Sequence, residues 1–109
     1  MNGFLVTFFT LEGRLHHGKA ISRCLIDMAR RIGICGVTEV AAIEGYGHHG
    51  KFHSARFFEL ADRPIEVSMA CTDDELQRLF AEIRKERMHV FYVKSAVEFG
   101  SLGEEPNGP

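Results

Sequence analysis

The residues best suited to chemistry gather in one short segment, which reads IEGYGHHGKFHSAR. Gly45 and Gly47, on either side of Tyr46, let the backbone come close to an anion, and successive backbone amides can form an anion-binding concavity. Lys51 and Arg56 add positive charge to the same segment. This pattern predicts a site for a small anion such as phosphate, although a glycine-rich loop between two strands often has no ligand.

Histidines are the second candidate, because imidazole is a common metal ligand. His48, His49 and His53 lie in the same segment, and His16 and His17 lie in an earlier loop. A structural zinc site needs four fixed ligands and a catalytic one needs three plus water, yet no cysteine or carboxylate stands at a recognisable ligand spacing. We therefore expect no metal. The alternative is a site in which an oligomer axis gathers copies of His48, His49 and His53.

Side chains suited to nucleophilic or acid–base catalysis are poorly placed. His53 and Ser54 are neighbours in a predicted strand, so their side chains point to opposite faces and cannot act as base and nucleophile. Asp73 and Asp74 are accounted for by the first turn of a helix, where acids are favoured. We expect a protein that is not an enzyme.

Composition narrows the class of protein further. The chain has 109 residues, 45% of them hydrophobic, and a formal net charge of -2, which predicts one domain and gives no basic footprint for nucleic acid. It has no apolar run of about 20 residues and no signal peptide, so we expect a cytoplasmic protein. Cys24, Cys35 and Cys71 lack the spacing of a metal site. They have apolar neighbours in the sequence, so we predict that they are buried free thiols.

Two helices follow from apolar spacing and end signals. Ile21, Leu25, Met28 and Ile32 form one helical face, which Gly33 is placed to end. A second helix is predicted after the sequence Thr-Asp-Asp-Glu at 72–75, which has the form of a capping box. Its apolar stripe consists of Leu76, Leu79, Phe80 and Ile83.

Five strands are predicted around these helices. They are Phe4 to Thr10, Val37 to Ile43, Phe52 to Leu60, Ile65 to Cys71 and His89 to Lys94. The second and third should form an antiparallel hairpin around the glycine-rich segment. The element order predicts an α+β fold, a ferredoxin-like split βαβ sandwich in which two helices cover one face of an antiparallel sheet.

The other face of that sheet also needs a cover, because several strands carry apolar or small residues on both sides. Oligomerisation through this face is the simplest solution, and closed cyclic symmetry is the usual arrangement. We assign residues 1–99 to the domain. Residues 100–109, rich in glycine, proline and acid, are expected to form a flexible tail.

The segment Ile43 to Arg56 resembles the signature of the PII-like proteins grouped as domain of unknown function 190, a Gly-aromatic-Gly turn followed by a His-Ser/Thr-Ala-Arg/Lys strand. Three further stretches are similar to this family, and the resemblance covers about nine-tenths of the chain. They are His17-Gly18-Lys19, Ala29 to Val37 and Phe58 to Glu75.

The resemblance implies a homotrimer of ferredoxin-like subunits, a regulatory protein with sheets packed around the threefold axis and a ligand in each cleft between subunits. Gly45, Tyr46 and Gly47 match the turn beside which PII proteins hold an adenine nucleotide, and Lys51 and Arg56 could contact its phosphates. The PII phosphate-binding segments before and after the last strand have no match here. A ligand smaller than ATP is thus implied: ADP, AMP, cyclic AMP or bicarbonate.

PII proteins also regulate a membrane transporter or an enzyme through a long docking loop. Only a few residues separate Gly47 from the next predicted strand, so a long loop of that kind is not expected here. The metal alternative, with His48, His49 and His53, would make the chain similar to the CutA trimers instead.

Overall fold

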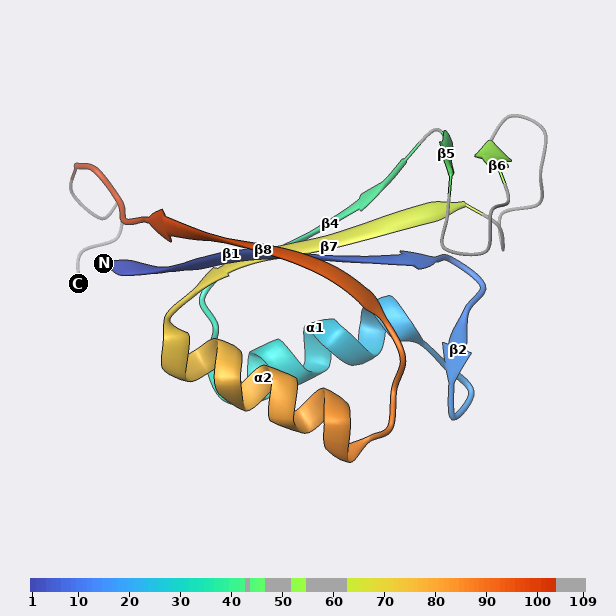
Figure 1. The fold of residues 1–109 in the computed structure, drawn as a ribbon, viewed down its shortest axis with the longest axis horizontal. Coiled ribbons are helices and arrows are strands. Elements are labelled where there is room, and N and C mark those ends of the chain that lie inside the picture. Colours follow the sequence, from blue (N-terminus) through green and yellow to red (C-terminus); the bar gives the residue numbers. More distant parts are fainter. Residues whose placement is uncertain (43, 47–51, 55–62, 104–109) are drawn as a thin grey trace.

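The protein folds as an antiparallel sheet with two helices against one face (Figure 1). The computed structural model describes residues 1–42, 44–46, 52–54 and 63–103. The main sheet has four strands in the order β4-β7-β1-β8, and every neighbouring pair is antiparallel. The strands are β1 (Asn2–Leu11), β4 (Val37–Ala41), β7 (Pro64–Cys71) and β8 (Phe91–Glu98). This confirms the predicted α+β, ferredoxin-like split βαβ architecture.

The core lies between the sheet and the helices α1 (Ile21–Ile32) and α2 (Asp73–Lys85). Along β7 buried and partly exposed residues alternate, as expected for a strand with one covered face. The side chains buried most completely come from both layers of the fold. They include Val6, Phe8, Val67, Met69 and Cys71 of the sheet and Leu25, Leu76 and Leu79 of the helices.

The helix ends are those that the local sequence signals predict. The Thr72 hydroxyl accepts a hydrogen bond from the Glu75 amide at 3.2 Å, and the Glu75 carboxylate accepts one from the Thr72 amide at 2.9 Å. Gly33 ends α1 with a φ of 96°, a left-handed conformation that glycine adopts at little cost. Both the capping box and the glycine cap are confirmed.

The strand pairing differs from the prediction around the glycine-rich segment. β4 ends at Ala41 and pairs with β7. The predicted hairpin exists only as a separate two-stranded sheet of β5 (Glu44–Tyr46) and β6 (Phe52–Ser54). Pro64 begins β7 and has no amide proton, so the β4–β7 ladder stops there and the chain leaves the main sheet. The rest of the predicted strand Phe52 to Leu60 lies outside the described residues.

Two smaller differences from the prediction concern the segment before α1 and the last strand. A short hairpin of β2 (Leu15–His16) and β3 (Lys19–Ala20) precedes α1, where we predicted only a loop. The last strand begins at Phe91 and continues to Glu98, beyond the predicted end at Lys94. Beyond it, Met1 and Phe99 exchange two backbone hydrogen bonds, of 2.8 and 3.0 Å.

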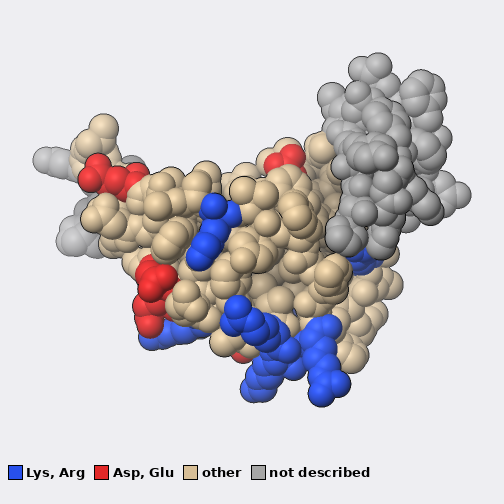
Figure 2. Space-filling model, in the orientation of Figure 1, with Lys and Arg blue, Asp and Glu red and all other residues tan. Residues whose placement is uncertain are grey.

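The sheet face opposite the helices exposes several large apolar side chains among polar ones such as Glu66. It carries the exposed side chains of Leu5, Phe9, Val40, Phe91 and Val93. Figure 2 shows that Lys and Arg gather instead over the C-terminal part of α2, whose last turn contains Arg84 and Lys85.

The three cysteines are not all buried, which corrects the prediction. Cys71 is buried, Cys24 is partly exposed and Cys35 is exposed. Ile34 takes the buried position directly after the α1 cap, so the next side chain points to solvent. Within the described part of the chain, neither helix is long and apolar enough to span a membrane.

Candidate ligand-binding site

The β5–β6 hairpin stands at one end of the main sheet, beyond the last residue of β4 (Figure 1). Gly45 lies opposite His53 in the antiparallel register, and Tyr46 lies opposite Phe52. We predicted that Gly45 and Tyr46 lie in the loop after a strand ending at Ile43. The structure places them in β5 instead, while their part in an anion site stays a prediction.

The backbone that carries this hairpin is fixed at both ends. The Ala42 amide donates a hydrogen bond to the Pro64 carbonyl at 2.8 Å, which joins the outgoing and returning chain. The Glu12 amide donates to the Arg63 carbonyl, also at 2.8 Å, which ties the returning chain to the end of β1. The chain on either side of residues 43–62 is thus held to the main fold by backbone hydrogen bonds.

An ion pair strengthens the same junction. Arg63 Nε lies 3.5 Å from Glu12 Oε2, and both atoms are buried without a hydrogen-bond partner among the described residues. The role of Arg63 at the base of the hairpin had no sequence signal, because Glu12 belongs to a different segment of the chain.

The other predicted binding residues lie outside the described residues. These are Gly47, Lys51 and Arg56 of the anion site and His48 and His49 of the alternative metal site. The anion site at Gly45, Tyr46, Gly47, Lys51 and Arg56 stays a prediction, and so does the alternative site of His48, His49 and His53.

Lys19, the last residue of the similar stretch His17-Gly18-Lys19, makes a contact within the domain. Its ammonium group donates a hydrogen bond to the Asp27 carboxylate of α1. This hydrogen bond holds the pKa of Asp27 below its usual value, against a weaker opposing effect of burial. The Lys19 charge is therefore engaged with α1.

The paired acids of α2 are also engaged on the helix surface. Asp74 pairs with Arg78 at 2.9 Å, one turn further along the helix, and Asp73 accepts a hydrogen bond from Gln77 at 3.5 Å. Such pairs at this spacing stabilise a helix by a few tenths of a kcal/mol. They agree with the interpretation of Asp73 and Asp74 as first-turn residues.

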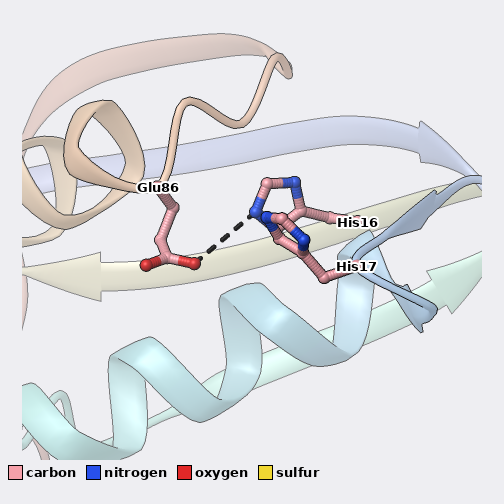
Figure 3. Close-up of side chains that lie close together, drawn as sticks. All are labelled: His16, His17 and Glu86. Atoms are coloured by element: carbon pink, nitrogen blue, oxygen red, sulfur yellow. Dashed lines mark ion pairs between the residues drawn. The ribbon is translucent and has the colours of Figure 1, made fainter.

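A second group of polar side chains lies near the other end of α2. His16 and His17 of the β2–β3 hairpin approach Glu86, which follows the last residue of α2 (Figure 3). His16 Nε2 lies 3.5 Å from Glu86 Oε1, and the two imidazole rings meet edge to face with centroids 4.2 Å apart. No carboxylate stands at ligand spacing from the two histidines in the sequence, because Glu86 is remote in the chain.

An open pocket of about 370 Å³ adjoins this group. It has apolar walls and three basic side chains, and His16 belongs to both the pocket and the histidine group. The pocket is lined by Arg14, Leu15, His16, Ile21, Met88 and His89.

Comparisons with known proteins agree with this fold. A "UPF0166 protein" of Aquifex aeolicus (strain VF5) is 28% identical over 81 residues, which are 73% of this chain and 77% of the relative. The structure is similar to CPII of Thiomonas intermedia K12, described as a nitrogen regulatory PII-like protein bound to ADP, AMP and bicarbonate. The TM-score is 0.68 at 20% identity, over 93% of this chain and 91% of CPII.

A putative PII-like signalling protein of Thermus thermophilus gives a TM-score of 0.65 at 17% identity, over 88% and 87% of the two chains. These likenesses show the fold. Residues 3–98 match the model of the DUF190 family, described as "Uncharacterized ACR, COG1993". The chain therefore belongs to the DUF190 family and has the fold of PII-like proteins.

Proposed function

We propose that the protein is a non-enzymatic PII-like regulator that binds a small anion, an adenine nucleotide or bicarbonate, between subunits of a homotrimer. The observation that carries this proposal is the β5–β6 hairpin, in which Gly45 and Tyr46 end a strand at the edge of a PII-like fold. The solved protein of similar fold, CPII, is described as bound to ADP, AMP and bicarbonate. Anions of these kinds suit a site made of backbone amides, Lys51 and Arg56.

The apolar sheet face supports the trimer. Leu5 and Phe9 of β1 and Phe91 and Val93 of β8 lie together on neighbouring strands, and Val40 of β4 lies on the same face beyond Glu66 of β7. Contiguous apolar patches of this kind are typical of protein interfaces. A trimer would cover them and would place the β5–β6 hairpin of each subunit beside a neighbour.

In this proposal the hairpin end of the sheet signals to a protein partner, a membrane transporter or an enzyme. The junction of Ala42 with Pro64 and of Glu12 with Arg63 supports such a role, because it holds the chain on both sides of residues 43–62 to the main fold. A ligand at Gly45 could then change the hairpin without disturbing the sheet.

Isothermal titration of the purified protein with AMP, ADP, ATP, cyclic AMP and bicarbonate tests the proposal. At least one ligand should bind, and the Gly45→Val variant should lose that binding while keeping the wild-type melting temperature. Gly36→Val is a matched control, because Gly36 has open space around its Cα and no positive φ. A well-folded trimer that binds none of these ligands would remove the sensor interpretation.

A further inference from the structure

We propose that His16, His17 and Glu86 form a binding site for one divalent transition-metal ion, Zn²⁺ being the ion that the donor set fits. The three side chains offer two imidazole nitrogens and one carboxylate oxygen, all within 4.8 Å of one another. Zinc is held by this set in sites that keep water as the fourth ligand. The site is separate from the proposed anion site, and it uses none of its residues.

The distances suit a metal better than a direct contact. With metal–ligand bonds of about 2.1 Å and tetrahedral angles, two ligand atoms lie about 3.4 Å apart. His16 Nε2 and Glu86 Oε1 are 3.5 Å apart. His16 Nε2 is also buried and has no hydrogen-bond partner among the described residues. Buried polar atoms normally have a partner, and a bound metal ion would provide one.

The backbone fixes both sides of the site. His17 and Gly18 link β2 to β3 with positive φ values of 52° and 78°, as in the two-residue turns of tight hairpins. This turn sets His17 beside His16. Positive φ is uncommon for residues other than glycine, although histidine is among those that adopt it more often.

Glu86 is held in a comparable way. It caps α2, and Arg87 follows with a positive φ of 55°. The Arg87 and Met88 amides donate to carbonyls of the last turn at 3.0 and 3.2 Å, which fixes the chain at this point. The C-terminal end of a helix carries partial negative charge, so a cation beside Glu86 is stabilised by α2 as well.

Figure 3 shows the result of these two constraints: the Glu86 carboxylate points toward both imidazole rings from the opposite side. His17 and Glu86 are exposed, and His16 is mostly buried, which leaves a metal ion accessible from solvent. The neighbouring pocket shares His16, so it offers room for a molecule bound beside the metal.

Zinc titration in a His48→Ala/His49→Ala/His53→Ala background tests the proposal, because that background removes the loop histidines as competing ligands. One Zn²⁺ should bind per chain. Glu86→Gln and His17→Asn should each weaken binding tenfold or more, since even the loss of an outer-shell partner costs about tenfold. Asn is chosen at position 17 because it tolerates the positive φ of the turn.

Glu82→Gln is the matched control for the carboxylate, because Glu82 lies one turn earlier on α2 and pairs with Arg31 instead. It should bind Zn²⁺ as the background protein does. A Co²⁺ titration adds a spectroscopic readout, as a tetrahedral site gives visible absorption that both site variants should lose. Absence of Zn²⁺ binding, or equal binding by the background protein, Glu86→Gln and His17→Asn, would overturn the proposal.

Discussion

Phe9 of β1 and Phe91 of β8 lie side by side on the sheet face opposite the helices, with ring centroids 5.8 Å apart. Both rings are exposed, at 38% and 54%. An aromatic pair on an open sheet surface is characteristic of the centre of an interface, where large rings supply much of the binding energy.

A charge placed in this pair should break the oligomer. If the proposed trimer forms through this face, Phe91→Glu should shift the protein from trimer to monomer, because a carboxylate would be buried without a partner at the interface. Light scattering coupled to size-exclusion chromatography measures the mass. Leu15→Glu is the control, since Leu15 is also an exposed apolar residue but lies in β2, away from this face. A trimer that survives Phe91→Glu would exclude this face as the interface.

Gly3→Ala should destabilise the fold. A Cβ at Gly3 would lie 2.1 Å from the Cys71 carbonyl oxygen and 2.9 Å from the Phe99 ring, so the strands would have to separate. We expect a loss of about 1–3 kcal/mol in the free energy of unfolding. Urea unfolding measures it. Gly36→Ala, where a Cβ meets nothing within 4 Å, should change stability by no more than about 0.5 kcal/mol.

The three thiols should react at very different rates with a thiol reagent in the folded protein. Cys35 is exposed and should react first. Cys71 should be inert until the protein unfolds, because burial, helped by the nearby Glu75 charge, raises the pKa of its thiol. Timed labelling followed by peptide mass spectrometry distinguishes them. Early labelling of Cys71 would contradict the packing described for β7.

The Lys19–Asp27 pair should make a small contribution to stability that depends on pH. Because the folded-state pKa of Asp27 is lowered by the hydrogen bond from Lys19, the contribution is present above the unfolded pKa. It is lost as the pH falls below about 4 and through the folded pKa. Lys19→Met should therefore lower the melting temperature at pH 7 more than at pH 2.

The double variant Lys19→Met/Asp27→Asn provides the control for that experiment. The melting temperatures of the double variant and of Asp27→Asn alone should differ by the same amount at pH 7 and at pH 2. If Lys19→Met destabilises equally at both pH values, the pair has no electrostatic role.

The helices and the core were predictable because their signals are local. The Thr72–Glu75 box, the Gly33 cap and the spacing of apolar residues all act within a few positions of the chain. The fold class followed from the order of elements. Membership of the DUF190 family followed from the motif around Gly45, which no general property of the composition would have indicated.

The partner of β4 and the position of Glu86 were not predictable in the same way. β4 is followed at once by a hairpin signal, but its hydrogen-bond partner is β7, and that choice depends on the packing of the whole sheet. Glu86 reaches His16 only because α2 ends beside the β2–β3 hairpin. Contacts between distant segments follow from the tertiary arrangement, and one sequence does not reveal them.

The backbone hydrogen bonds between Met1 and Phe99 hold the two ends of the domain next to each other. A short linker between these two residues would close the chain into a ring without altering any strand. The order of elements along the chain could then be permuted, with new ends opened at another surface turn, while the three-dimensional arrangement stays the same. The fold thus depends on which strands are neighbours in the sheet and much less on the residue at which the chain starts.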